Sequence, residues 1–125
     1  MNLPKDYQQV MPSLIVNGAA AFQQFMTKVF GAREKMIVPD GDSQIMHGEV
    51  LIGDSMIMFA DSTNEFTPKP AALMIYVKDA DATYKKALDE GAETIFAPAD
   101  KEYGRSAGAK DKWGNSWYIT SIPKP

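Results

Sequence analysis

The stretch QIMHGEVLIGDSMIMFA, residues 44–60, decides how this chain folds. Two runs rich in apolar and β-branched residues, 44–52 and 55–60, flank the dipeptide Gly53-Asp54. A two-residue connection of this kind between two such runs is typical of a tight β-hairpin. The sequence therefore predicts two long antiparallel strands in the middle of the first half of the chain.

The register of this hairpin decides which side chains share a face. A two-residue turn pairs Ile52 with Ser55, and Glu49 then lies opposite Met58. Because side chains alternate along a strand, His47 lies on the same face as Glu49. We expect this pair to point into a concave pocket, away from the helices. A slip of one residue would reverse the two faces.

Upstream of the hairpin, the pattern predicts a strand, a helix and a second strand. The first strand covers residues 13–16, and Asn17 is the predicted N-cap of an amphipathic helix that ends at Gly31. Residues 35–38 form the next strand, and residues 39–42 form a turn before the hairpin.

The second half of the chain repeats this order. A strand at residues 72–77 precedes a helix with Asp79 as its N-cap, and further strands are predicted at 94–97, 105–110 and 116–121. A fixed repeat of one supersecondary unit is stronger evidence than any single element. The sequence therefore predicts an α+β fold built from two βαβββ modules.

These modules form one predicted domain of 125 residues. The first module covers residues 10–60, a polar linker covers 61–70, and the second module covers 71–121. Each module has one helix to cover one face of its sheet. The other face must meet the other module or a second chain, or line a cavity, so we expect any function to lie between the halves.

Four local motifs make this repeat similar to a known family. They are VNGAA at 16–20, VFGA at 29–32, MHGEVLIGDS at 46–55 and KDKWGNSW at 110–117. The chain resembles the vicinal-oxygen-chelate superfamily, which includes glyoxalases, dioxygenases and bleomycin-resistance proteins, and within it the PhnB-like branch. The resemblance implies that the two modules form a cupped mixed β-sheet and that the protein is a homodimer.

The resemblance also implies where a metal ion would bind, because the metal enzymes of the superfamily place one ligand on each of four strands. The matching positions are Met11 or Ser13, Met58, Ala72 and Tyr118. None of these side chains is a normal ligand for a hard or borderline divalent ion. We therefore expect no metal site and no cofactor, and keep a metal-dependent glyoxalase-like enzyme as an alternative.

His47 and Glu49 admit three interpretations. As an acid/base pair they would serve a lyase or isomerase, because histidine titrates near neutrality and partial burial raises the pKa of a glutamate. They could instead orient a bound ligand, or form a hydrogen-bonded pair with no catalytic task. A metal ion held by these two residues alone would leave too many ligand positions vacant.

Further ligand-binding candidates follow from the same alternation. Methionine adapts to irregular apolar shapes, and aromatic rings stack on planar molecules. An arginine that follows Tyr103-Gly104 at the pocket mouth would pair with a carboxylate or phosphate. The predicted ligand-binding residues are Ser13, Met56, Met58, Met74, Tyr76, Tyr103, Arg105 and Tyr118. The methionines and tyrosines of this set would serve equally well as core residues.

Composition excludes several function classes. Thirteen Lys and Arg against 16 Asp and Glu give a net charge of −3, which leaves no basic surplus for nucleic acid. The absence of cysteine excludes disulfide frameworks and thiolate sites. No apolar run approaches the ~20 residues that span a bilayer, and no secretory signal is present, so we expect a cytoplasmic protein without a membrane partner. The predicted function is metal-independent binding of a small molecule.

Overall fold

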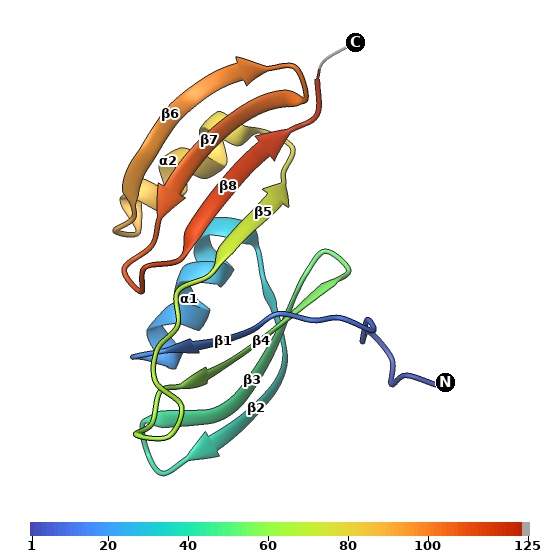
Figure 1. Cartoon of the computed structure of the whole chain (residues 1–125), viewed down its shortest axis with the longest axis vertical. Helices are drawn as coiled ribbons and strands as arrows, with labels where there is room; N and C mark the ends of the chain where they lie inside the picture. The colour runs from blue at the N-terminus through green and yellow to red at the C-terminus, as the bar shows by residue number, and fades with distance from the viewer. Residues whose placement is uncertain (124–125) are drawn as a thin grey trace. The chain divides into compact units, whose positions relative to one another are not determined.

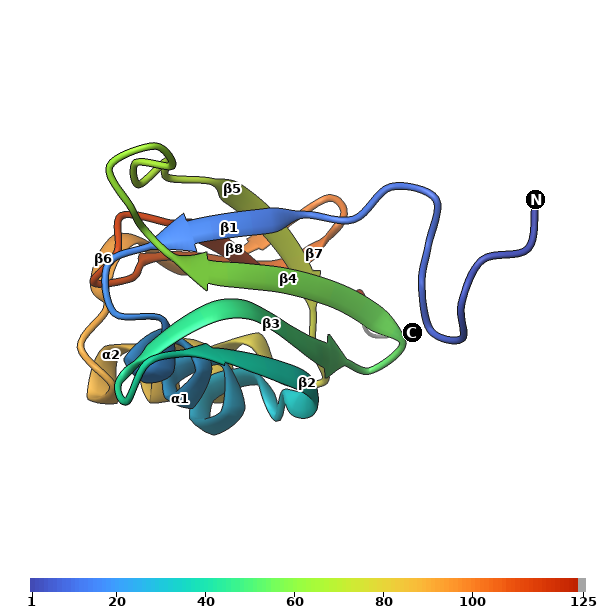
Figure 2. The same ribbon diagram turned by 90° about the horizontal axis from the view of Figure 1, so that it is seen from below.

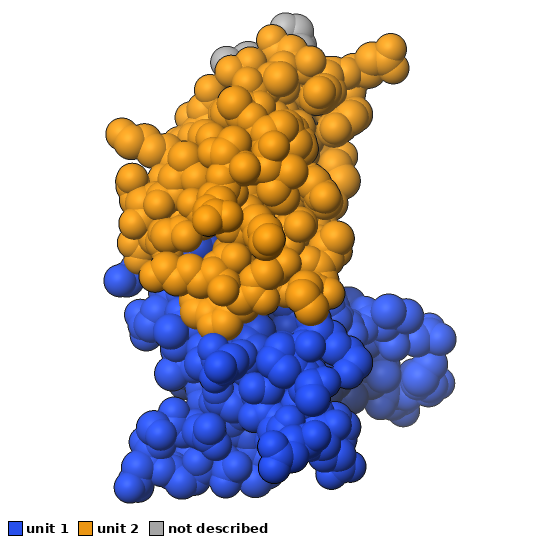
Figure 3. Space-filling model, turned by 60° about the vertical axis from the view of Figure 1, so that its left-hand side comes forward, with its two compact units in different colours: residues 1–69 blue, residues 70–125 orange. Residues whose placement is uncertain are grey.

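The computed structural model describes residues 1–123, which belong to two compact units, residues 1–69 and 70–125 (Figure 3). The first unit contains β1 (Ser13–Val16), α1 (Ala19–Phe30), β2 (Arg33–Asp40), β3 (Gln44–Ile52) and β4 (Ser55–Asp61). The second unit contains β5 (Ala72–Tyr76), α2 (Ala80–Asp89), β6 (Glu93–Lys101), β7 (Gly104–Lys110) and β8 (Ser116–Ser121). Within the described residues, no helix is both long enough and apolar enough to cross a membrane.

Each unit is a four-stranded mixed sheet with one helix on one face (Figures 1 and 2). The strand order is β1-β4-β3-β2 in the first unit and β5-β8-β7-β6 in the second. The edge strands β1 and β5 run parallel to β4 and β8, and the other pairs are antiparallel. This arrangement confirms the predicted α+β fold of two βαβββ modules.

The central hairpin has the expected register. Ile52 pairs with Ser55, and Glu49 pairs with Met58. On the face that α1 covers, Phe22 and Phe59 meet edge to face with their ring centroids 6.0 Å apart. Glu49 therefore lies on the opposite, helix-free face, because it alternates with the residues that pack beneath α1.

Two strands are longer than the sequence predicted. β2 extends through Pro39 and β6 extends through Pro98, whereas the sequence predicts that these strands end at residues 38 and 97. Each strand lies at the edge of its sheet, and register shifts interrupt its pairing at Val38/Pro39 and Phe96/Ala99. A proline at a bulge or on an edge strand leaves no donor missing from the sheet, so the strand continues.

The start of α1 corrects the prediction that Asn17 is its N-cap. The N-cap residue is Gly18, which has φ 101° and contributes no side chain. Instead, Asp61 at the end of β4 accepts hydrogen bonds through Oδ1 from the backbone N–H groups of Gly18 and Ala19, at 3.0 and 2.9 Å. Its Oδ2 accepts a third from Ile45 at 2.7 Å. One carboxylate thus joins three elements of the first unit.

Two side chains accept backbone N–H groups at the start of α2 in the second unit. Asp79 is the N-cap, as predicted, and its side chain accepts the N–H of Ala82. In addition, Ser121 Oγ at the end of β8 accepts the N–H of Ala80 at 2.6 Å. Ser121 in β8 is the counterpart of Asp61 in β4, because each is the last residue of its strand and accepts a backbone N–H at the start of the helix. The two units therefore share the same connection between last strand and helix.

Candidate functional site

The helix-free face of the first unit carries the predicted pair His47 and Glu49. Cross-strand pairing places Met36 beside Glu49 and Val38 beside His47, while Met58 lies on the other side of Glu49. Met36 and Val38 are 43% and 37% exposed. The face is therefore an apolar surface with one imidazole and one carboxylate in it.

Glu49 is buried, with only 1% of its surface exposed. Its Oε2 atom accepts a hydrogen bond from Tyr7 Oη at 2.5 Å and lies 2.7 Å from Nε2 of His47. Its Oε1 atom is also buried and has no hydrogen-bond partner among the described residues. Two donors therefore meet at one oxygen of the carboxylate, and the second oxygen retains an unused capacity to accept a hydrogen bond.

The surroundings of Glu49 keep it ionised. Burial is the largest single influence and raises its pKa, but hydrogen bonds from Tyr7 and His47, together with electrostatic interactions with His47 and Lys35, outweigh it. The net result is that the pKa of Glu49 lies below its ordinary value of 4.5. The same hydrogen bond raises the pKa of Tyr7 above 10.0, because ionising the phenol would place two negative charges together.

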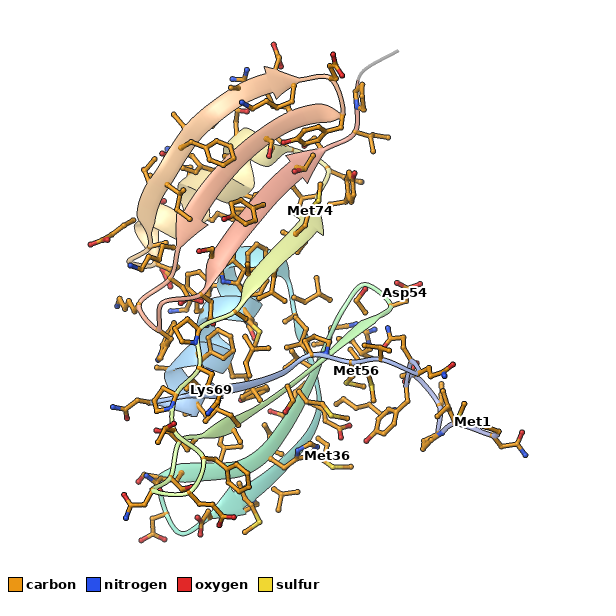
Figure 4. The ribbon with its side chains drawn as sticks, in the orientation of Figure 1. Met1, Met36, Asp54, Met56, Lys69 and Met74 are labelled. Atoms are coloured by element: carbon orange, nitrogen blue, oxygen red, sulfur yellow. The ribbon has the colours of Figure 1, made fainter. Side chains whose placement is uncertain are left out.

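Tyr7 reaches this site from the segment that precedes β1. Asp6 pairs with Lys35 Nζ of β2 at 2.9 Å, and Gln8 Nε2 donates to the carbonyl of Asp54 in the β3–β4 turn at 3.1 Å. Figure 4 labels Asp54 and, on β4, Met56. Polar contacts on both sides of Tyr7 therefore hold its ring beside Glu49. The sequence analysis missed Tyr7, because no local pattern connects residues 42 positions apart.

The other predicted ligand-binding residues of the first unit differ in their burial. Met58 is half-buried on the face that carries Glu49, and Ser13 pairs with Met58 from the exposed edge strand β1. Met56 is only 1% exposed and belongs to the core. Met56 therefore offers no open surface to a ligand, although strand alternation placed it with Met58.

A second feature lies on the helix-free face of the second unit, where a hollow of about 610 Å³ opens. It brings together four predicted ligand-binding residues, Met74, Tyr76, Tyr103 and Tyr118. The remaining lining residues are Phe96, Ser106 and Thr120. We refer to these seven residues as the aromatic hollow.

The aromatic hollow contains one pair of stacked rings and one pair of hydrogen-bonded hydroxyl groups. Phe96 and Tyr118 stack with their ring centroids 6.2 Å apart and an interplanar angle of 18°. Ser106 and Thr120, both buried, are joined by a 3.0 Å hydrogen bond between their hydroxyls. Tyr76, Tyr103 and Met74 are each at least half exposed.

Sequence analysis did not assign Phe96 to this face, and the strand shows why. A register shift between Thr94 and Phe96 interrupts the alternation of β6, so counting from the strand start fails there. Gly108 of β7 makes room for the ring, because a Cβ atom at that position would lie 2.7 Å from Cε1 of Phe96.

Arg105 lies in a different hollow from the tyrosines. That hollow, of about 950 Å³, is lined by charged side chains and by the start of α2. The guanidinium of Arg105 forms two hydrogen bonds with Asp81, at 2.9 and 3.1 Å, and a longer one with Asp100 at 3.4 Å. These carboxylates raise the pKa of Arg105, and they occupy donors that a ligand anion would need.

A family model described as the glyoxalase/bleomycin resistance protein/dioxygenase superfamily matches residues 8–119. An uncharacterised protein of Mycobacterium bovis is 30% identical over 120 residues, covering 86% of this chain and 79% of that protein. A protein of Mycobacterium tuberculosis is also 30% identical over 120 residues, and this match covers 86% of this chain and 71% of that protein.

Solved structures share the fold at lower identity. TioX from Micromonospora sp. ML1 superposes with a TM-score of 0.77 at 20% identity, covering 93% of this chain and 99% of that one. A putative 3-demethylubiquinone-9 3-methyltransferase, PhnB protein, from Bacillus cereus gives 0.74 at 19%, covering 92% and 100%. TnmS3, described as an antibiotic binding protein from Streptomyces sp. CB03234, gives 0.71 at 17%, covering 93% and 99%.

The resemblance would place a metal ion at Met11 or Ser13, Met58, Ala72 and Tyr118, and these side chains do not suit one. They carry the thioether of Met58, the hydroxyl of Ser13, the methyl group of Ala72 and the phenol of Tyr118. Thioether, neutral hydroxyl and methyl groups are poor donors for divalent zinc, iron or manganese. Among residues 1–123, no group of three or more His, Cys, Asp or Glu side chains is arranged to hold a metal ion.

Proposed function

Because the chain belongs to the glyoxalase/bleomycin resistance protein/dioxygenase superfamily, we propose that it binds a small, planar, uncharged molecule in the aromatic hollow without a metal ion. The observation that carries this proposal is the stacked pair of Phe96 and Tyr118 in a hollow whose other aromatic residues, Tyr76 and Tyr103, are exposed. A hollow of about 610 Å³ lies in the size range of small-molecule sites.

The lining of the aromatic hollow indicates the chemistry of the ligand. Aromatic faces gain stacking energy of about 0.5–1.5 kcal/mol per ring pair beyond the burial of area. Met74 adds an adaptable thioether, and the hydroxyls of Ser106 and Thr120 supply polar contacts at the base. None of the seven lining residues is charged, and the nearest charge to the stacked rings recorded in the structure is Lys101 Nζ, 5.6 Å from the centroid of Phe96, so the lining itself favours an uncharged ligand.

One structural neighbour supports the binding of a small molecule. TnmS3 is described as an antibiotic binding protein, and a second Streptomyces protein with this fold is described as a glyoxalase/bleomycin resistance protein. A fold alone does not assign a function. The proposal therefore rests on the aromatic lining, with TnmS3 in agreement.

The test is a thermal-shift series with neutral polycyclic aromatic compounds of two to four rings, on protein treated with a chelator. A ligand at 100 times its Kd stabilises the folded state by about 2.7 kcal/mol, which raises Tm by about 10 °C for a domain of this size. Tyr118→Ala should abolish the shift, because it removes one of the two stacked rings. Phe66→Ala is the matched control, since Phe66 is an exposed aromatic residue outside the hollow.

Two results would contradict the proposal. One is an equal shift in the wild-type protein and in Tyr118→Ala, which would place the ligand elsewhere. The other is a shift that appears only after a divalent ion is restored, which would make binding metal-dependent.

A further inference from the structure

The first unit holds a buried charge that its fold does not require. Glu49 is 1% exposed, whereas its counterpart in the second unit is a glycine. The equivalence follows from register, because Glu49 pairs with Met58 and Gly108 pairs with Tyr118, and these partners pair in turn with the parallel edge strands. The same frame therefore forms without a carboxylate at this position.

The free-energy cost of burying the Glu49 carboxylate is offset by its hydrogen bonds with His47 and Tyr7. Oε2 of Glu49 lies 2.7 Å from Nε2 of His47 and accepts the Tyr7 hydroxyl as well. An ionised carboxylate accepts hydrogen bonds only, so Nε2 of His47 carries its proton toward Glu49. This fixes Nδ1 as the basic nitrogen, and Nδ1 has no partner among residues 1–123.

His47 is accessible where Glu49 is not. The imidazole side chain is 37% exposed, and the carboxylate behind it is 1% exposed. Met36 and Val38, on the neighbouring strand, are also partly exposed on this face. A molecule with an apolar body that lies on these side chains would present its edge to the imidazole.

The geometry points to a proton-transfer site in the first unit, in which His47 removes a proton from an apolar small molecule with an acidic C–H bond. Glu49 and Tyr7 are positioning residues: they set the tautomer of His47, and the carboxylate stabilises the imidazolium that forms. This inference uses neither residues nor volume of the aromatic hollow, so it stands or falls separately from the binding proposal.

The probe is 5-nitrobenzisoxazole, a planar compound whose ring opens when a base removes its single C3 proton. The proton moves to Nδ1 of His47, the C–H electron pair completes the nitrile, and the N–O bond breaks to leave a coloured nitrophenolate. The imidazolium then returns the proton to water. The step is balanced without a metal ion, an oxidant or a second substrate.

We expect the wild-type protein to open the probe with saturation kinetics, and His47→Ala to lose about 10²-fold in kcat/KM. His47 is partly exposed, so this variant should fold, which a thermal melt checks. Glu49→Gln keeps the shape of the side chain and should lower kcat by about tenfold or more with KM unchanged. Lys85→Ala is the control, because Lys85 is an exposed residue of α2 in the second unit, and this variant should keep the full rate.

A second measurement does not depend on the probe. His47 is the only histidine, so a ¹⁵N–¹H long-range correlation spectrum reports this one ring. We expect the wild-type ring to carry its proton on Nε2, and Glu49→Gln to lose that preference. A merely structural hydrogen bond elsewhere on the face would not change the tautomer.

Each opposite result overturns the inference. A wild-type rate equal to that of His47→Ala, or to free imidazole at the same concentration, removes the base. A full rate in Glu49→Gln, or a wild-type ring protonated on Nδ1, removes the positioning role. Loss of the rate in Lys85→Ala would show that the rate does not report on His47.

Discussion

At the scale of single residues, Tyr7 decides how Glu49 behaves. It supplies one of the two hydrogen bonds that offset the burial of the carboxylate, and it comes from a segment outside the sheet. A hydrogen bond to a charged group contributes about 1.5–3 kcal/mol. Removing the donor leaves a buried charge with one partner fewer.

Tyr7→Phe should therefore lower the free energy of unfolding at neutral pH by about 1.5–3 kcal/mol, measured by urea denaturation. Tyr103→Phe is the matched control, because Tyr103 is 50% exposed and should lose little. Equal costs for the two variants would show that the Tyr7 hydroxyl does not stabilise Glu49.

The low pKa of Glu49 predicts a pH dependence of stability. The folded state binds the Glu49 proton more weakly than the unfolded state, so the stabilisation is present above pH 4.5 and is lost as pH falls through the lower, folded-state pKa. The unfolding free energy of the wild-type protein should thus fall more steeply below pH 4.5 than that of Glu49→Gln. Parallel curves would contradict the assignment.

Sequence patterns located some site residues and missed others for identifiable reasons. Strand alternation placed His47 and Glu49 on one face, because β3 pairs with β2 without a shift from His47 to Glu49. Alternation also led to Met56, which the structure buries, since face alone does not determine depth. Phe96 follows a bulge, and Tyr7 approaches from 42 positions away, so neither shows a periodic signal.

At the scale of elements, the last strand of each unit is hydrogen-bonded to the start of the helix of that unit. Asp61 accepts three backbone N–H groups from two other elements and the residue before α1. Helix α1 was predictable from the spacing of its apolar residues, but its N-cap was not. The capping carboxylate is distant in sequence, so the local rule selected Asn17.

Asp61→Ala should cost about 3 kcal/mol, because it leaves several backbone donors without an acceptor. Asp79→Ala removes a local N-cap that accepts the N–H of Ala82 and should cost about 1 kcal/mol. Chemical denaturation of both variants checks this order. A larger loss for Asp79→Ala would contradict the account.

The contact between β3 and β4 beneath α1 is equally specific. A Cβ atom on Gly48 would lie 2.4 Å from Cζ of Phe59, so Gly48→Ala should destabilise the fold by about 1–3 kcal/mol. Adding Phe59→Leu should recover part of that loss, since the smaller side chain makes room. A double-mutant cycle without coupling would argue against this overlap.

At the scale of the whole molecule, two units share one strand order and differ in what their helix-free faces carry. The first presents an imidazole and a buried carboxylate, and the second presents stacked rings over two hydroxyls. The repeat, and with it the fold, was predictable because each module repeats its own periodicity. The division of chemistry between the faces was not, because it depends on burial and on Tyr7.

We propose that the chain forms a homodimer, because both helix-free faces expose large apolar side chains such as Met36, Met74 and Tyr76. Sedimentation equilibrium should give twice the chain mass of 13.8 kDa. Replacing both Met36 and Met74 with Lys should shift the equilibrium toward the monomer. Phe66→Lys is the control, and a monomeric wild-type protein at micromolar concentration would contradict the proposal.

The hydrogen bond between Tyr7 and Glu49 affects how the protein should be prepared. A purification tag or a protease remnant fused ahead of Met1 lies within seven residues of the phenol that contacts Glu49. Preparations that differ only at their N-terminus can then differ at His47. A tag at the C-terminus avoids that variable and makes batches of this protein comparable.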